Sequence, residues 1–239
     1  MNLIIDIGNT RTKIYLFKKD EIVEKYFFFN EEAKAIEKQL SQIKYAKCLI
    51  SSTAELAAFY KELAFIELDH NTNIPLTLDY KTPSTLGSDR IALSVGAETL
   101  FPNKNCLIIG TGTCITIDFK DENACYLGGA ISPGLTIRLQ SLHTFTDKLP
   151  LIKPKESKKE FLLMGKSTVE SIESGVFNGT FAEIEGTIAR YKDIYKDLTV
   201  ILTGGDQEIF EKNLKSNIFT SLNLQAIGLN RILNYNAEK

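Results

Sequence analysis

The sequence predicts an α/β fold of two related halves, each with a mixed sheet flanked by helices and with a cleft between the halves. Segments with strand-like and helix-like patterns alternate along the chain, as they do in α/β domains. A strand, glycine turn, strand pattern at residues 3–14 recurs at residues 107–118, and Gly112 lies 104 residues after Gly8. A third strand, 198–202, also runs into a glycine turn. The repeat indicates a duplicated domain, divided here into 1–103 and 104–239, although chance resemblance between two glycine hairpins is the alternative.

In the N-terminal half, the apolar run that ends at Asp6 predicts a buried strand, and the alternating residues after the turn predict its antiparallel partner. Pro83 interrupts a segment that we expect to be a loop, residues 81–87. The remaining strands are expected at 21–29, 48–52 and 76–80. The apolar spacing predicts helices at 31–43, 54–62 and 89–100.

In the C-terminal half, strands are expected at 106–109 and 126–131, and a charged loop at 153–159. The helices are expected at 135–145, 167–190 and 222–235. Within the second of these, Gly175 and Gly179 would let another backbone pack close, because neither has a side chain.

The composition favours small-molecule partners. The 28 Lys and Arg nearly balance the 30 Asp and Glu, and the net charge of −2 argues against a nucleic-acid surface. No apolar run reaches the ~18 residues of a membrane span, and the N-terminus has no basic segment with a cleavage site, so we expect a cytoplasmic protein without membrane contact. The two histidines, His70 and His143, are too isolated to suggest a metal centre. The cysteines form no Cys-x-x-Cys pair, which predicts buried free thiols at Cys48, Cys106, Cys114 and Cys125.

The first glycine turn has the features of a phosphate-binding turn. Gly8 has no Cβ, so an anion can approach the backbone, and the turn amides with the hydroxyls of Thr10 and Thr12 are expected to donate to it. Asp6 would repel that anion, which suggests a divalent cation between them. The alternative is a hairpin in which Gly8-Asn9 only makes the turn.

The type and order of the motifs indicate which class of phosphate-binding protein the chain resembles. Neither the P-loop pattern nor the dinucleotide-binding pattern occurs, and each of the first two turns leads into another strand. This arrangement resembles the phosphate grip of the actin-like ATPase and sugar kinase superfamily, whose lobes are ribonuclease H-like. The following motifs also occur in the order seen in type III pantothenate kinases: Asp6-x-Gly8-Asn9-Thr10, Tyr80, Gly87-Ser88-Asp89-Arg90, Gly112-Thr113 with Asp118, Gly128-Gly129-Ala130-Ile131-x-Pro133-Gly134, Lys148-Leu149-Pro150, Gly165-Lys166-Ser167-Thr168 and Thr203-Gly204-Gly205.

The resemblance implies an activity: ATP-dependent phosphorylation of pantothenate to 4'-phosphopantothenate, the first step of coenzyme A biosynthesis. It also implies Mg2+ as a cofactor and a homodimer with the active site at the interface. Two other functions stay open. One is a kinase of another small hydroxy acid, and the other is a non-catalytic nucleotide-binding regulator of the same fold.

The resemblance also implies residue roles, with Asp89 as the acceptor of the hydroxyl proton. Asp6 would position Mg2+ through phosphate or water. The nucleotide-binding positions fall on Asp6, Ile7, Gly8, Asn9, Thr10, Arg11, Thr12, Lys13 and Thr113. The substrate-binding positions fall on Tyr80, Gly87, Ser88, Asp89, Arg90 and Thr168. From the residues alone, the cap of a helix N-terminus is favoured over a base for Asp89, Thr168 is equally such a cap, and Arg90 is a surface residue of a first helical turn.

Gly110 departs from the family pattern, which usually has an aspartate there as a ligand of a monovalent cation, K+ or NH4+. Glycine offers only its carbonyl. We therefore expect that this chain needs no potassium or replaces it.

Overall fold

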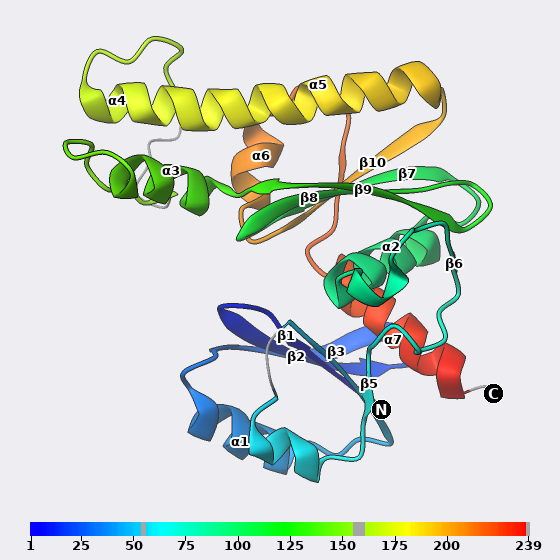
Figure 1. Cartoon of the computed structure of the whole chain (residues 1–239). Coiled ribbons are helices and arrows are strands. Elements are labelled where there is room, and N and C mark those ends of the chain that lie inside the picture. The colour runs from blue at the N-terminus through cyan, green and yellow to red at the C-terminus, as the bar shows by residue number, and fades with distance from the viewer. Residues whose placement is uncertain (54–55, 155–160, 238–239) are drawn as a thin grey trace. The chain divides into compact units, whose positions relative to one another are not determined.

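The computed structural model of the chain describes residues 1–53, 56–154 and 161–237 (Figure 1). The chain forms two compact units. The first comprises Met1–Asn103, Lys120–Gly128 and Asn223–Lys239, and the second comprises Lys104–Phe119 and Gly129–Leu222. The chain therefore leaves the first unit after Asn103, and two later segments also belong to this unit, one of which carries the C-terminal helix.

The first unit is built on a mixed sheet with the strand order β3-β2-β1-β4-β5. Strand β1 pairs antiparallel with β2 and parallel with β4, so the hairpin predicted for the N-terminus is confirmed. The strands are β1 (Asn2–Ile7), β2 (Arg11–Lys18), β3 (Glu21–Phe29), β4 (Lys47–Ser52) and β5 (Ile66–Glu67).

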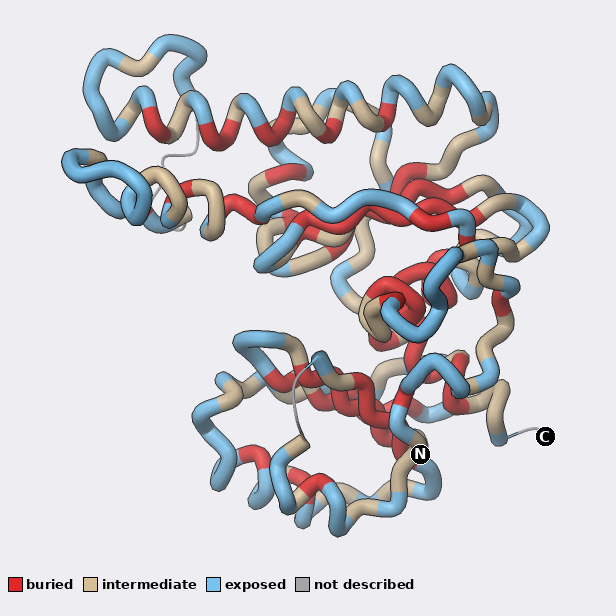
Figure 2. Tube along the Cα trace, in the orientation of Figure 1, coloured by how far each residue is buried: buried red, intermediate tan, exposed pale blue. Residues whose placement is uncertain are grey.

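Both faces of this sheet are covered, and its central strands are buried (Figure 2). Because alternate strand residues point to opposite faces, Leu3 and Ile5 pack with helix α1 (Ala33–Gln42). Ile4 and Tyr15 pack on the other face, with helices α2 (Ser88–Leu100) and α7 (Leu224–Ala237). A strand buried on both faces explains the continuous apolar run at the N-terminus.

Helices α2 and α7 pack at backbone contact. A Cβ added at Gly228 would lie 1.8 Å from the carbonyl oxygen of Ala92, and one added at Gly96 would lie 2.2 Å from that of Leu224. Glycine at both positions allows the helices to approach this closely. This packing explains why the C-terminal segment belongs to the first unit.

One helix predicted from the apolar spacing is wrong. Residues 54 and 55 lie outside the described part, Leu56 and Ala57 are not helical, and only the 3-10 helix η1 (Ala58–Glu62) forms. The segments expected as a strand and a loop at 76–87 contain the short strand β6 (Thr77–Leu78) and the 3-10 helix η2 (Pro83–Thr85). Local apolar spacing cannot separate such short helical turns from a full helix.

The second unit is built on strands β11-β10-β7-β8-β9, in that order. Strand β10 pairs in parallel with both β7 and β11. The strands are β7 (Asn105–Thr111), β8 (Cys114–Lys120), β9 (Cys125–Pro133), β10 (Leu198–Gly204) and β11 (Phe219–Thr220). The start of β9, at Cys125 and Tyr126, belongs to the first unit and pairs there with β6.

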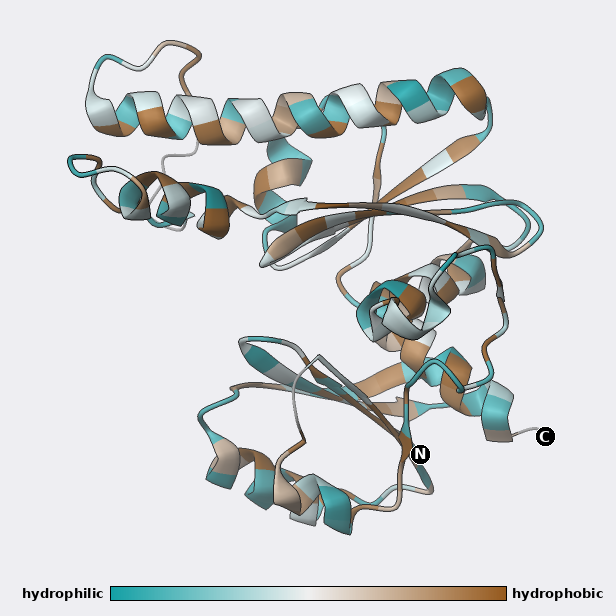
Figure 3. Cartoon of the chain, in the orientation of Figure 1, coloured by the Kyte–Doolittle hydropathy of each residue, from teal (hydrophilic) through white to brown (hydrophobic). Residues whose placement is uncertain are grey.

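The long helical stretch predicted for the second half is present. It runs without a break through α4 (Thr168–Glu173), the π-helical turn η4 (Ser174–Asn178) and α5 (Gly179–Ile194). Hydrophobic and hydrophilic segments alternate along it (Figure 3), and Phe177, Phe181 and Ile184 pack into the core of this unit. The other helices of the unit are α3 (Leu135–Thr144) and α6 (Gln207–Asn213). Most of the charged loop expected at 153–159 lies outside the described residues.

The cysteine prediction is only partly right. All four thiols are free, and Cys48 and Cys106 are buried, but Cys114 is exposed and Cys125 is half-buried. Cys114 is exposed because it is the first residue of β8, directly after the second glycine turn. Within the described ranges, no helix is long and apolar enough to cross a membrane.

Candidate active site

The turn between β1 and β2 is held from behind by Asn30, the residue that follows β3. The Asn30 side-chain amide donates to the carbonyl of Gly8 at 2.8 Å, and its backbone N–H donates to Thr10 O at 3.2 Å. The N–H of Gly8 itself donates to Arg11 O at 3.0 Å, closing the turn. Asn9, Thr10 and Arg11 remain exposed. The hydrogen bonds from Asn30 to the turn are tertiary contacts, which the local sequence pattern does not predict.

Two residues of this segment face inward and support the turn. Thr12 is 1% exposed, and its hydroxyl donates to the Asn30 side-chain oxygen at 3.0 Å, so it braces the turn from inside the unit. The Ile7 carbonyl accepts from Thr53 N–H at 3.0 Å. The outward groups available to an anion are therefore the exposed backbone and the side chain of Thr10, rather than the hydroxyl of Thr12.

Asp6, at the end of β1, is buried, and both of its carboxylate oxygens have partners. Lys13 Nζ donates to Oδ2 at 3.2 Å, and Gln225 Nε2, from α7, donates to Oδ1 at 2.8 Å. Burial raises the pKa of the Asp6 carboxyl above its ordinary value, and the charge of Asp89 raises it further, whereas Lys13 and Gln225 oppose this rise. The structure thus brings the carboxylates of Asp6 and Asp89 within electrostatic reach of each other.

The motif Gly87-Ser88-Asp89-Arg90 forms the start of α2. The N-cap is Gly87 and not Asp89, so the capping alternative for Asp89 is wrong. A Cβ at Gly87 would lie 2.5 Å from Asp89 Oδ1, which shows that this carboxylate lies over the glycine. Ser51 Oγ, at the end of β4, donates to Ser88 Oγ at 3.1 Å and ties the helix start to the sheet. Arg90 is 5% exposed, so the surface alternative for it is also wrong.

Tyr80 lies at the edge of the apolar core of the first unit. Its ring centroid is 5.9 Å from that of Tyr126. Gly128 has φ +99°, which favours glycine, and a Cβ there would be 3.7 Å from the Tyr80 ring. The ring is therefore packed on one side by Tyr126 and Gly128 and is half-buried overall.

A magnesium site in the first unit would have few protein ligands. No group of three or more His, Cys, Asp or Glu side chains is placed to hold a metal within residues 1–53, 56–154 and 161–237. A carboxylate oxygen is nevertheless the ligand that Mg2+ prefers, and Mg2+ commonly keeps several waters and binds phosphate oxygens with only one or two carboxylates. Asp6 fits that pattern.

The second unit has its own cluster of glycine turns, around Thr111 and Thr113. Gly112 N–H donates to Cys114 O at 3.1 Å, so this turn is one residue shorter than the first. A Cβ on Gly134, the N-cap of α3, would lie 2.2 Å from Gly112 O, and one on Gly204 would lie 2.1 Å from Thr111 O. Backbones from three parts of the chain therefore meet there without side chains between them. Thr113 is exposed at this turn.

Gly110, which stands where the family usually has an aspartate that binds a monovalent cation, lies in β7 opposite Thr203 of β10. One residue further along, the Thr111 hydroxyl donates to the carbonyl of Thr203 at 2.8 Å. Near Gly110 the two neighbouring strands are thus joined through backbone and hydroxyl groups, and position 110 itself contributes no carboxylate.

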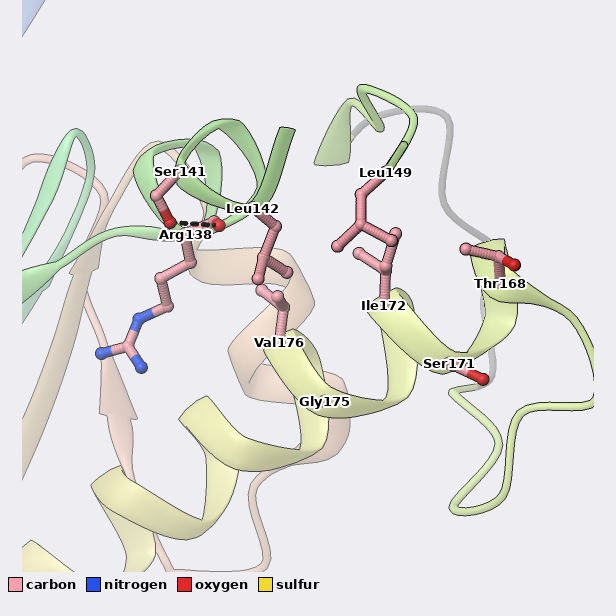
Figure 4. Close-up of a pocket in the computed structure, with 9 residues that line it drawn as sticks. All are labelled: Arg138, Ser141, Leu142, Leu149, Thr168, Ser171, Ile172, Gly175 and Val176. Carbon is pink, nitrogen blue, oxygen red and sulfur yellow. Dashed lines mark hydrogen bonds between the residues drawn. The ribbon is translucent and has the colours of Figure 1, made fainter. Parts of the chain in front are cut away.

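Thr168 lines a hollow of about 550 Å3 in the second unit. The N-cap of α4 is Ser167, whose Oγ accepts from Glu170 N–H at 3.2 Å, so the capping alternative for Thr168 is wrong. In this hollow Leu149 and Ile172 point toward each other, and Leu142 points toward Val176 (Figure 4). The guanidinium of Arg138 points away from it. The middle of the lining is thus apolar, with Thr168 and Ser171 at one end and Ser141 and Arg138 at the other.

The fold defines the class of protein: it is that of the actin-like ATPases and sugar kinases. A solved structure from Sinorhizobium meliloti described as a 2-dehydro-3-deoxygalactonokinase matches 100% of this chain and 98% of its own, with a TM-score of 0.57 and 13% identity. Another, from Campylobacter jejuni, described as a Baf family transcriptional activator, matches 99% and 100% with a TM-score of 0.66 and 21% identity. At these identities the likeness shows the fold alone.

The family follows from sequence. The model of the family type III pantothenate kinase matches residues 2–190. The type III pantothenate kinase of Christiangramia forsetii is 44% identical over 245 residues, which cover 99% of each chain. This chain belongs to the type III pantothenate kinase family.

Proposed function

We propose that this chain transfers the γ-phosphoryl group of ATP to the primary hydroxyl of pantothenate, giving 4'-phosphopantothenate, the first step of coenzyme A biosynthesis. Membership of the family supports the substrate. The observation that carries the mechanism is the position of Asp89, at the start of α2 and within electrostatic reach of Asp6 beside the glycine turn. The residue proposed as proton acceptor and the turn proposed to bind phosphate thus lie in the same compact unit.

Asp89 acts as the proton acceptor. A carboxylate is too weak a base to deprotonate an alcohol in advance, but it can orient the hydroxyl and take its proton as the phosphoryl group moves. The glycine at position 87 leaves the space that the Asp89 carboxylate occupies. Arg90 has the forked guanidinium that binds carboxylates, and its burial would strengthen such a contact. The other substrate positions are Tyr80, Gly87, Ser88 and Thr168.

The first turn, residues 6–13, is proposed to bind the nucleotide, and Thr113 of the second turn is a further proposed nucleotide-binding position. In the first turn, Thr10 and the exposed backbone donate to phosphate, Lys13 supplies a point charge, and Thr12 braces the turn through Asn30. Mg2+, held by Asp6 through water or phosphate, would neutralise charge on the phosphoryl oxygens when bound. With glycine at position 110, we infer that the chain needs no potassium or replaces it.

We also propose a homodimer whose active sites lie at the interface, with Thr168 contributing to the site. Nothing lies within 4 Å of a Cβ added at Gly175 or Gly179, so a second backbone has room to approach this helix. Leu163 and Met164, just before it, are 82% and 80% exposed. Sedimentation velocity with activity measured on each fraction tests the proposal, and a fully active monomer would contradict it.

The division of the chain into duplicated halves and its cellular location are inferred from the same family membership. We take residues 1–103 and 104–239 as the duplicated halves, with the C-terminal helix of the second half packed on the first unit. We place the reaction in the cytoplasm, where ATP and the precursors of coenzyme A are used.

The decisive experiment is a coupled ADP-release assay with and without pantothenate, applied to the wild type and to Asp89→Asn. The variant should fold and bind ATP but lose about 100-fold or more of its turnover, the usual contribution of a general base. Asp20→Asn, an exposed carboxylate in the turn after β2, is the matched control and should turn over normally. Near-normal turnover of Asp89→Asn would refute the assigned acceptor.

The same assay separates the two other functions. ATP binding without any pantothenate-dependent ADP release would indicate a nucleotide-binding regulator. Faster ADP release with a different hydroxy acid would indicate a kinase of another substrate.

A further inference from the structure

Gln225 contacts the first turn from the other end of the chain. Its Nε2 donates to Asp6 Oδ1 at 2.8 Å, whereas Lys13 Nζ donates to Oδ2 at 3.2 Å. The Lys13 side chain is 38% exposed, whereas that of Asp6 is only 8% exposed, so the lysine reaches the carboxylate from the solvent side. The lysine can turn toward solvent or a bound anion, whereas the half-buried Gln225 is carried by α7, whose backbone is packed against α2.

The backbone of α7 fixes the position of Gln225. Its neighbour Leu224 presents a carbonyl oxygen 2.2 Å from where a Cβ on Gly96 of α2 would be, and Gly228 lies one turn further along against Ala92. These contacts lock α7 to α2. Since α2 also carries Asp89 in its first turn, one rigid pair of helices determines where both Gln225 and Asp89 stand.

A buried carboxylate needs hydrogen-bond donors to keep its orientation. A lysine that also binds the nucleotide cannot keep its hydrogen bond to Asp6 at all times. A neutral amide on a packed helix can. Gln225 brings no charge of its own, so it orients Asp6 without competing with it for a cation.

We propose that Gln225 is a positioning residue, which holds Oδ1 of Asp6 so that the carboxylate is set for the magnesium-bound nucleotide while Lys13 is free to move to the phosphates. The inference rests on the role of Asp6 in the proposed function. It adds a residue more than 200 positions away from the turn that it serves.

Gln225→Met tests this, because methionine has nearly the same length and shape but no donor. The dissociation constants of ATP with and without Mg2+ are measured by isothermal titration calorimetry, with kcat and KM for pantothenate from the ADP assay. A hydrogen bond to a charged group is worth about tenfold or more in affinity. We expect Mg2+-ATP to bind about tenfold more weakly, ATP without Mg2+ to bind within about twofold of wild type, and KM for pantothenate to stay unchanged.

Gln42→Met is the matched control, since Gln42 is the exposed last residue of α1, and it should leave every value unchanged. If Gln225→Met fails to fold, Gln225→Asn, which keeps an amide but is one methylene too short to reach Asp6, gives the same readout. A variant that is folded and shows the wild-type ratio of the two ATP affinities would overturn the proposal, even if its Tm is lower. Absence of pantothenate phosphorylation by the wild type would refute the proposed function instead, and nucleotide binding would still decide the role of Gln225.

Discussion

Gly228 in α7 lies against the backbone of Ala92 in α2 so closely that a Cβ at position 228 would be 1.8 Å from the Ala92 carbonyl oxygen. No side-chain rotation relieves that overlap, because the obstructing atom belongs to the backbone. The two helices that carry Gln225 and Asp89 therefore depend on this glycine for their spacing.

Gly228→Ala should accordingly destabilise the first unit, by about 3 kcal/mol, since the helices must move apart in a packed core. Urea denaturation measures the loss. The matched control is Gly186→Ala in α5, where nothing lies within 4 Å of the added Cβ and the change should stabilise by about 0.5 kcal/mol. Equal effects of the two substitutions would show that helix propensity, and not the contact with Ala92, governs position 228.

Lys120 is a second buried support of α2. Its ammonium group is fully buried, contacts the carboxylate of Glu98 and donates to Phe101 O at 3.1 Å. Lys120→Met removes the charge and leaves Glu98 partly buried without its partner, which should cost about 3 kcal/mol. The double variant Lys120→Met with Glu98→Gln should recover part of the loss in the same urea titration. A double variant as unstable as the single one would show that the charge on Glu98 is not the cause.

The thiols should differ sharply in reactivity. Burial raises the pKa of the Cys48 thiol to about 12, so below that pH it is the neutral, unreactive form, while Cys114 is exposed. Iodoacetamide at pH 8 should label Cys114 and spare Cys48, and raising the pH to 9 should still spare Cys48. Peptide mass spectrometry reads the labels, and 8 M urea serves as the control in which both are labelled. Labelling of Cys48 in the folded protein would contradict its burial.

Glycine at position 110 should make turnover independent of potassium. A carbonyl alone is a poor substitute for the charge of a carboxylate, so replacing K+ by Na+ should change kcat by less than about twofold. Gly110→Asp should then create stimulation by K+ or NH4+, which the ADP assay detects in matched buffers. Loss of wild-type turnover in sodium or Tris buffer would contradict the prediction.

Local patterns in the sequence were enough for most of the elements that hold the site. The hairpin of β1 and β2 follows from an apolar run, a glycine turn and an alternating segment, and the long helix from Thr168 follows from its apolar spacing, so short-range patterns predict both. The segment at 54–62 shows the limit, because its apolar spacing is that of a helix although only a short 3-10 turn forms. The prediction that Cys114 is buried was wrong for a similar reason. Its apolar neighbours predict a strand, but they do not show that Cys114 is the first residue of that strand, beside an exposed turn.

By itself, the sequence determined the α/β class, the glycine turns, the family and the residues proposed for chemistry, because each of these depends on short motifs and on their order along the chain. Only the tertiary structure decided which groups surround them. Asn30 behind the first turn, Ser51 against Ser88 and Gln225 against Asp6 join segments that are 22 to 219 residues apart. Such contacts depend on how helices and strands pack. Local sequence patterns do not predict that packing.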